Sequence, residues 1–407
     1  MEKIELSEQH RKRRLIAAAL FLAIGAVAIA YGFFLLVAGD SGWREIESAG
    51  SGEINCAGDF VFMYNVGASG VAAATENRAL TALYTEATVT AYRLFTVDER
   101  FDGVNNMAAI NAHPNEELEV DGVLYEALAA FVRHGRRELY LGPVVESYDD
   151  IFFAVDDVYA RELDPYLNEE AAAYYAQIAA YARQSAHVDV QLLGDNRIKL
   201  FVSDEYLRFA RENEITAFID FAWTKNAFIA DFLAETILAN GYTLGVISSF
   251  DGFSRSLTEE GISYSLKLYD RVEQAVFSPA VMEYSSPTAI VSLRNFPASG
   301  QDLARYYTYA SGAVRSLFLD VQDGRCKSTI DSLTGYSQRL KCAEILMELI
   351  PVYISERFDG AALIALSGEG LHSIWREGSV LRYTDPALTL TNLYEGESFS
   401  CTAQLVS

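Results

Sequence analysis

The 407-residue sequence is poor in the residues that mark zinc-binding, disulfide-rich or disordered proteins. Its four cysteines, at positions 56, 326, 342 and 401, include no CxxC pair, which argues against a zinc or thioredoxin-like site. Its five histidines contain no pair spaced i, i+4, so a histidine metal site or a Ser-His-Asp triad has no support. Eight prolines beside 51% hydrophobic residues indicate a folded chain. We also find no glycine-rich phosphate loop of Walker or Rossmann type and no internal repeat.

Basic residues are scarce and unevenly placed. The chain has 32 Lys and Arg against 56 Asp and Glu, and five of the basic residues lie within the first 14 positions together with three acidic ones. The remainder therefore holds 27 basic and 53 acidic residues, a net charge of −26. Such a surface repels phosphate backbones and anionic lipid, so we expect no nucleic-acid partner.

One long hydrophobic run stands near the N-terminus. Leu15–Ala38 holds 24 residues without a charge, which is enough to cross a hydrocarbon core of roughly 30 Å. Because the basic cluster 10–14 precedes it and Asp40 follows it, we expect a cytoplasmic N-terminus and a single-pass anchor in membrane lipid. The bulk of the chain would then be extracytoplasmic. A cleaved signal peptide is the alternative, although its apolar region is usually about 7–15 residues long.

The predicted organisation is a basic tail (1–14), a membrane helix (15–38), a Gly/Ser-rich linker (39–55) and one folded unit (56–407). In that compartment disulfides are allowed, so Cys326 with Cys342 and Cys56 with Cys401 are candidate pairs, and buried free thiols are the alternative.

Helical and strand patterns are segregated along the folded unit. Helical spacing covers 79–95, 124–132, most of 148–183 with a break near 164–165, and 340–350, while short strands are predicted at 188–193, 198–202, 242–248, 263–268, 274–277 and 289–293. The segment 218–240 opens as a strand and continues as a helix that ends at Gly241. This arrangement predicts an α+β fold rather than a doubly wound parallel sheet.

Two polar segments are candidates for chemistry. Asp331-Ser332-Leu333-Thr334-Gly335 reads as a tight loop that could hold a divalent ion or a phosphate, although such loops are also common simply as turns. Asp220 to Asn226 spans the predicted start of a helix, where unpaired N–H groups attract anions and Lys225 adds a full charge. The plainer interpretation is that Thr224 caps the helix and Lys225 is solvated.

Taken in order, several segments resemble the ApbE family, the FAD:protein FMN transferases. Phe218 to Ala230 is similar to the family's D-L-G-G-I-A-K-G-Y-A-V-D helix entry, with Asp220, Lys225 and Asp231 in place. Residues 331–335 are similar to its H-I-x-D-P-x-T-G segment, and 342–344 to its A-D-A-L-S-T helix. Weaker likenesses are Tyr92 to Phe95 with 106–111, Val120 to Pro143, the turn 249–252 that contains Asp251, and 308–312.

The resemblance implies a two-lobed α+β domain around mixed sheets and Mg-dependent transfer of FMN from FAD to a hydroxyl of another protein. It implies that Asp331 and Thr334 are catalytic, and that FAD is bound by Asp220, Lys225, Asp251 and Gly335. An envelope flavoprotein is the implied acceptor, since the family often works outside the cytoplasmic membrane.

Three departures from the family pattern concern the same sites. Lys327 and Ser328 stand where the family has histidines, and Asn226 stands where it has a glycine. Glu344 and Glu348 replace the metal-binding aspartate and a threonine; four residues apart on one helix face, they could hold Mg²⁺ or simply form a solvated acidic face. The alternative function is therefore a catalytically inactive flavin-binding or protein-interaction module of the cell envelope.

Overall fold

The computed structural model describes residues 41–50, 52–257, 262–285, 287–396 and 399–406. The predicted membrane segment Leu15–Ala38 lies outside these ranges. Within them, no helix is both long and apolar enough to cross a bilayer.

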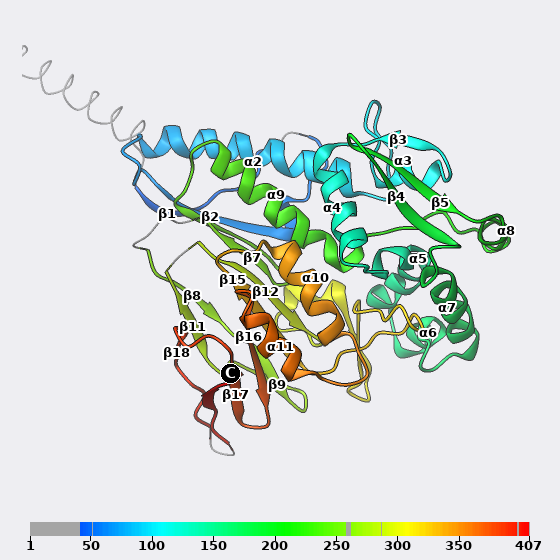
Figure 1. Cartoon of the computed structure of the whole chain (residues 1–407). Helices are drawn as coiled ribbons and strands as arrows, with labels where there is room; N and C mark the ends of the chain where they lie inside the picture. Colours follow the sequence, from blue (N-terminus) through cyan, green and yellow to red (C-terminus); the bar gives the residue numbers. More distant parts are fainter. Residues whose placement is uncertain (1–40, 51, 258–261, 286, 397–398, 407) are drawn as a thin grey trace, which may run out of the picture.

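A nine-stranded sheet organises the larger lobe (Figure 1). All of its neighbouring strands are antiparallel except the last two, which are parallel, so the sheet is mixed as expected. In spatial order it comprises β1 (Gly42–Glu45), β2 (Phe60–Val66), β6 (Gly245–Ser249), β7 (Phe253–Ser256), β12 (Ala289–Arg294), β15 (Ser332–Ser337), β16 (His372–Glu377), β17 (Val380–Tyr383) and β19 (Thr402–Leu405).

Helices cover one face of this sheet. The long helix α2 (Ala73–Phe95) packs beside α9 (Lys225–Ala239), and α10 (Cys342–Tyr353) and α11 (Gly360–Ser367) complete the layer (Figure 1). Because α9 and α10 are apolar on most of their surface, they lie at the centre of the main hydrophobic core.

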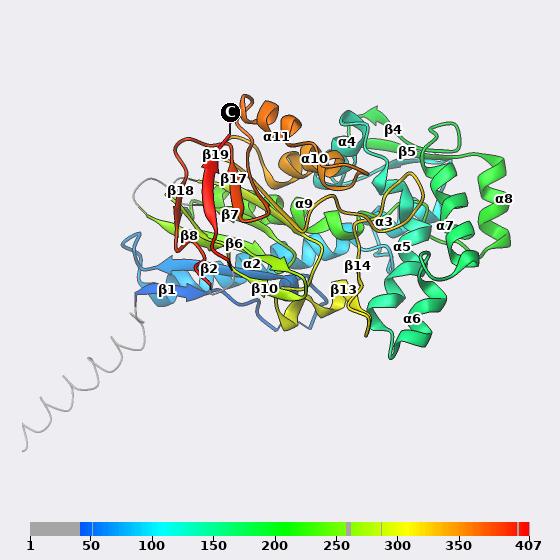
Figure 2. The ribbon, with the colours of Figure 1, turned by 90° about the horizontal axis from the view of Figure 1, so that it is seen from below.

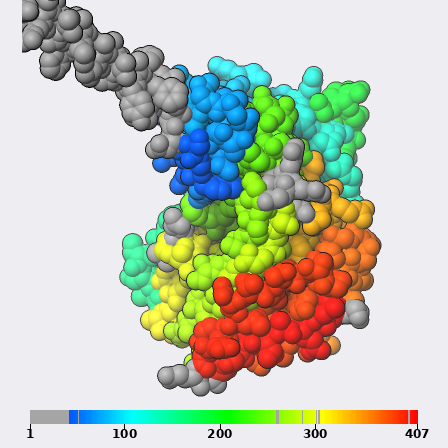
Figure 3. Space-filling view, turned by 90° about the vertical axis from the view of Figure 1, so that its left-hand side faces the viewer, coloured from blue at the N-terminus to red at the C-terminus, as the bar shows by residue number. Residues whose placement is uncertain are grey.

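A small sheet covers part of the other face. Strands β8 (Tyr264–Lys267), β11 (Val281–Tyr284) and β18 (Thr389–Thr391) form it, and a separate apolar cluster that includes Met282, Ile290 and Tyr336 lies beneath. Figure 3 shows the N-terminal strands and the C-terminal segment together on one face of the molecule. Two further strand pairs are β9 (Asp270–Val272) with β10 (Ala275–Phe277), and β13 (Tyr306–Thr308) with β14 (Val314–Ser316).

The smaller lobe is mostly helical and lies at one end of the large sheet (Figure 2). A three-stranded sheet, β3 (Glu117–Glu119), β5 (Arg197–Val202) and β4 (Val188–Gly194), packs with the helices of this lobe. These helices are α3 (Met107–Ala112), α4 (Gly122–Arg133), α5 (Gly142–Tyr148), α6 (Asp157–Leu163), α7 (Glu169–Ala182) and α8 (Asp204–Glu212). The short 3₁₀ helices are η1 (Ala57–Asp59), η2 (Glu138–Leu141), η3 (Asp149–Phe153), η4 (Ala222–Thr224) and η5 (Gly300–Arg305).

The α+β prediction is confirmed, and most predicted helices and strands are present within a few residues. Four local predictions differ from the structure. Residues 42–45, expected in the linker, form edge strand β1. Residues 218–221 are not a strand, residues 332–335 lie in strand β15 instead of a loop, and helix α11 was not expected. All four cysteines are free thiols.

Candidate functional site

A cavity of about 590 Å³ lies where the two lobes meet, at the N-terminal end of α9. Three of the predicted cofactor-binding residues, Asp220, Lys225 and Asp251, line it together. Aromatic side chains form other parts of its wall. The principal remaining lining residues are Cys56, Asp59, Tyr92, Phe95, Asp98, Glu146, Asp149, Asp150, Trp223, Asn226, Phe250 and Arg305.

Hydrogen bonds to Asn111 and Leu139 hold the backbone of residues 219–220, just before α9, at the edge of the cavity. The side chain of Asn111 accepts from the N–H of Ile219 at 3.0 Å and donates to its carbonyl at 2.9 Å. The N–H of Asp220 donates to the carbonyl of Leu139 at 2.9 Å. Because these backbone N–H and C=O groups bond to a side chain and to a 3₁₀ helix, they do not pair with a neighbouring strand, and the predicted strand does not form.

A strained turn then directs the chain into the helix. Asp220 Oδ1 accepts from the N–H of Ala222 at 2.7 Å, and Ala222 adopts φ = +47°, a conformation that is unfavourable for residues with a Cβ. Lys225 is the first residue of α9, so its ammonium adds to the partial positive charge of that helix end. Among the described residues, no ion pair involves Lys225. Strain of this kind is typical of functional sites.

Carboxylates dominate the cavity wall. Seven acidic side chains face two cations, Lys225 and Arg305. Burial, followed by the neighbouring carboxylate of Asp220, raises the pKa of Asp149 to about 6. Burial likewise raises the pKa of Asp220 despite the nearby Lys225. Both shifts come mainly from burial, and the excess of negative charge on the wall follows from its seven carboxylates against two cations.

Two buried oxygen atoms in the cavity have no hydrogen-bond donor. Asn226 Nδ2 donates to Asp251 Oδ2 at 2.9 Å, while Asn226 Oδ1 and Asp251 Oδ1 are unpartnered. Arg305 lies 3.9 Å from Asp251 Oδ2 and 3.6 Å from Asp59. The turn that carries Asp251 needs a glycine next, because Gly252 has φ = +106° and a Cβ there would lie 2.2 Å from the carbonyl oxygen of Ser292. Two acceptors beneath the cavity wall are therefore left without a donor from the described residues.

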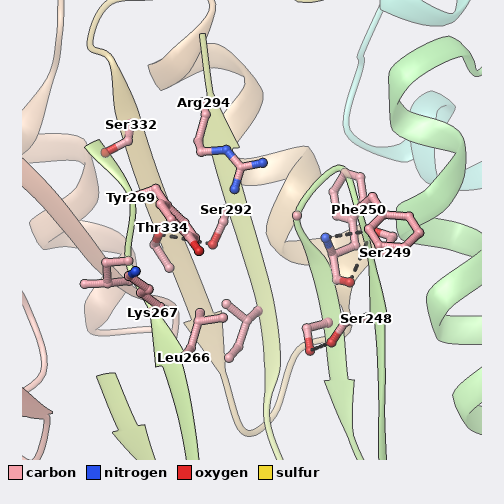
Figure 4. A pocket seen from close by; sticks show the side chains of 15 residues that line it. Ser248, Ser249, Phe250, Leu266, Lys267, Tyr269, Ser292, Arg294, Ser332 and Thr334 are labelled. Carbon is pink, nitrogen blue, oxygen red and sulfur yellow. Dashed lines mark hydrogen bonds between the residues drawn. The ribbon is translucent and has the colours of Figure 1, made fainter. Parts of the chain in front are cut away.

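A second, smaller cavity of about 120 Å³ adjoins the first, since Phe250 lines both. Figure 4 shows Thr334 in this cavity beside Ser292, whose hydroxyl lies 3.2 Å from that of Thr334, with Arg294 above them. Thr334 therefore faces a site next to the one lined by Lys225, not the same one.

The other two predicted site residues of the segment 331–335, Asp331 and Gly335, have internal contacts. Asp331 forms an ion pair of 2.9 Å with Arg271. Gly335 lies in the centre of β15, where a Cβ would come within 2.6 Å of Leu349 and 3.2 Å of Ile345. Because helix α10 lies directly on it, Gly335 has a packing function in this structure.

The two predicted metal ligands also have internal partners. Glu344 accepts from the N–H of Lys341 at 2.8 Å and so stabilises the start of α10. Glu348 lies 3.4 Å from His134 Nε2. Across the described part of the chain, no three His, Cys, Asp or Glu side chains gather closely enough to hold a metal ion by themselves.

Sequence reasoning missed Asp149 and Arg305. Asp149 lies in a segment predicted to be helical, where nothing marked it as a site residue, and Arg305 lies far along the chain from the predicted lining residues Asp220, Lys225 and Asp251. Asn226 was visible only as a departure from the family's glycine.

Solved structures share this fold. The ApbE protein of Thermotoga maritima superposes with a TM-score of 0.53 at 14% identity, covering 82% of this chain and 93% of that one. The flavin transferase ApbE of Vibrio cholerae gives a TM-score of 0.53 at 11% identity with the same coverage. No protein-family model and no curated protein matches the sequence. The chain thus has an ApbE-like fold.

Proposed function

We propose that this chain binds FAD in the two adjoining cavities and acts as a divergent FAD:protein FMN transferase. The observation that carries the proposal is the position of Lys225, which forms no ion pair among the described residues, at the start of α9 inside the large cavity of an ApbE-like fold. The ammonium and the dipole of α9 at that end together favour a diphosphate.

The residues around Lys225 suit the rest of such a ligand. Trp223 and Phe250 offer flat apolar surfaces for a ring system, and the unpartnered oxygens of Asn226 and Asp251 accept from ring or sugar donors. The smaller cavity, with Thr334 and Arg294, lies where the other end of an extended ligand would reach.

Magnesium fits the donor chemistry of the large cavity. Its carboxylates are hard oxygen ligands, and Mg²⁺ usually combines one or two of these with water and substrate phosphates. When bound, the ion would neutralise charge on the diphosphate. Asp149 and Asp220 are two of the lining carboxylates that could hold the ion. Glu344 and Glu348 stay the ligands predicted by the resemblance, and they would have to leave their present partners.

The alternative, a flavin-binding module without turnover, is favoured by a separate observation. Asp331 is already neutralised by Arg271, and Glu344 caps a helix, so neither is free to act in a reaction as the structure stands. Both functions share the FAD site and differ only in the release of AMP.

We extend the proposal to location. With Leu15–Ala38 in membrane lipid, the folded unit would lie outside the cytoplasmic membrane, within reach of an envelope flavoprotein acceptor. Protease added to intact spheroplasts should then digest the folded unit; complete protection in intact spheroplasts with digestion after lysis would refute this placement.

The test of function uses the full-length protein in detergent with FAD, Mg²⁺ and a flavin-acceptor protein. Release of AMP together with covalent flavin on the acceptor supports the transferase, and FAD binding without AMP release supports the module. Lys225→Met should weaken FAD binding by roughly 10- to 100-fold, as expected for the loss of a charge-assisted contact of about 1.5–3 kcal/mol. Lys199→Met, on strand β5 away from the cavity, is the matched control. Equal FAD affinity in the two variants would remove Lys225 from the site.

A further inference from the structure

Exposed apolar side chains are concentrated in one short segment. Among the described residues, 14 large hydrophobic side chains are exposed, and six of these lie between positions 153 and 167. The most exposed are Val155 at 89%, Val158 at 71% and Phe153 at 66%, with Tyr159 on the same helical turn at 43%. We call these four residues the α6 patch. Concentrations of this kind on a soluble domain mark interaction surfaces.

The α6 patch is exposed although its helix is firmly attached. Asp157 accepts from the hydroxyl of Tyr307 at 2.9 Å and from the N–H of Ala310 at 3.1 Å. At the other end of α6, fully buried Asp164 accepts from the hydroxyl of Tyr309 at 2.9 Å and from Arg315 at 2.8 Å. Because hydrogen bonds hold α6 at both ends, the backbone that carries Val158 and Tyr159 needs little ordering when a partner binds.

One short helix connects the α6 patch to the cavity. Helix η3 runs from Asp149, which lines the cavity, to Phe153, which opens the patch. The cavity wall on this side is acidic, formed by Asp98, Glu146, Asp149, Asp150 and Asp220; we call it the acidic wall. Of the two cations that line the cavity, Lys225 acts on Asp149 and Asp220. Asn226, 4% exposed, adds an unpartnered acceptor oxygen deeper in the same cavity.

The negative charge of the acidic wall limits which partners can bind the α6 patch and the cavity together. A second copy of the chain, with net charge −24, and an anionic bilayer would both be repelled. A bare metal ion does not need the α6 patch, and the described carboxylates form no compact metal site. A protein segment that joins apolar side chains to Lys or Arg satisfies the patch, the acidic wall and the unpartnered acceptors together.

We propose that η3 and α6 form the docking site for a basic, partly apolar segment of a partner protein, whose cationic side chains face the acidic wall. The assignment of that segment to the flavin acceptor rests on the proposed function; the docking itself does not. The substrate class proposed for this cavity is therefore a protein whose acceptor segment is basic.

The test uses a fluorescein-labelled 15-residue peptide of Leu, Lys and Ser, with a Leu, Glu and Ser peptide for comparison. Binding to the full-length protein is measured by fluorescence anisotropy. Val155→Ser with Val158→Ser should weaken binding of the lysine peptide by about tenfold, as should Asp149→Asn with Asp150→Asn. Val276→Ser and Asp102→Asn, each exposed elsewhere, are the matched controls and should change it less than about twofold. The patch variant keeps every charge, so it separates docking from general attraction to an acidic protein.

Three results would overturn the proposal. One is equal lysine-peptide affinity in the patch variant and the wild type. Another is that the glutamate peptide, or the simple polycation spermine, binds the wild type as tightly as the lysine peptide does, and that the patch variant binds it equally well. The third is a wild-type dimer in sedimentation that the patch variant converts to monomer. FAD binding is measured in parallel. Binding of the lysine peptide without FAD binding would refute the proposed function and leave the docking site standing. Binding of FAD without binding of the peptide would refute the docking site and leave the proposed function standing.

Discussion

Asp231 is the residue whose replacement we expect to cost most stability. It lies on α9 with 6% of its surface exposed, accepts from the N–H groups of Cys342 at 3.0 Å and Ala343 at 2.9 Å, and pairs with Arg255 of β7. One carboxylate thus joins α9, β7 and the first turn of α10.

The magnitude follows from what Asp231→Ala leaves behind. The guanidinium of Arg255, with 15% of its side chain exposed, would stay buried without a counter-charge, and two N–H groups of α10 would lose their acceptor. Removing one partner of a buried ion pair typically costs about 3–5 kcal/mol. A domain is usually stable by only about 5–15 kcal/mol, so the variant should approach the limit of folding.

Urea unfolding of the full-length protein in detergent, followed by circular dichroism, measures this loss. Glu235→Ala, on the same helix but with an exposed ion pair to Lys341, is the matched control and should change the free energy of unfolding by less than about 1 kcal/mol. The double variant Asp231→Leu with Arg255→Met removes both charges and should recover most of the loss. A decrease below about 1 kcal/mol for Asp231→Ala would refute the reasoning.

Four other variants test particular sites. Gly335→Ala should destabilise the protein by about 1–3 kcal/mol by overpacking against α10 while FAD affinity is unchanged, and a selective loss of FAD affinity would show a binding function instead. Ala222→Gly should stabilise it by about 1 kcal/mol by removing the strain of a positive φ, and a loss of stability would show that Ala222 is not strained. Glu344→Ala should cost about 0.5–1 kcal/mol through the lost cap, and a fall in Mg²⁺ affinity measured by calorimetry would establish it as a metal ligand. Because the folded-state pKa of Asp149 is raised, its contribution to stability is present below the unfolded pKa and lost as pH rises toward 6. Asp149→Asn should therefore raise stability at pH 7 by about 1 kcal/mol, a value reduced by solvent screening, and flatten the dependence between pH 4 and 6; an unchanged pH profile in urea titrations would contradict this.

Local patterns predicted the helices best. The apolar spacing over 79–95 corresponds to α2, and the end of α9 before Gly241 follows from that glycine's positive φ. The hairpin of β4 and β5 was visible from its polar turn at 194–196. In each case the signal and the structure depend on residues close together in sequence.

Tertiary partners decided the elements that were predicted wrongly. Residues 332–335 have the composition of a turn, yet β12 and β16 pair with them on both sides and make them a central strand. Residues 218–221 have the composition of a strand, yet Asn111 and Leu139 take their backbone groups. No local pattern contains those partners.

The same limit applies to the candidate site. Asp220 and Lys225 were found because they belong to one segment, and Asp251 because it lies in a recognisable turn. Asp149 and Arg305 reach the cavity from other segments, so only the fold identifies them. The internal partner of Asp331, Arg271, likewise comes from a segment 60 residues earlier in the chain.

If Leu15–Ala38 spans a membrane as proposed, strand β1 limits how freely the folded unit can move relative to it. The strand begins at Gly42, so the three residues 39–41 separate the predicted spanning segment from the nine-stranded sheet, in place of the 17-residue linker first expected. At roughly 3.5 Å per residue, that stretch reaches only about 10–15 Å. A protein tethered so closely would stay within a short distance of the bilayer surface and adopt only a restricted set of orientations. Acceptors standing near the membrane surface would then meet it far more often than those projecting high above the lipid.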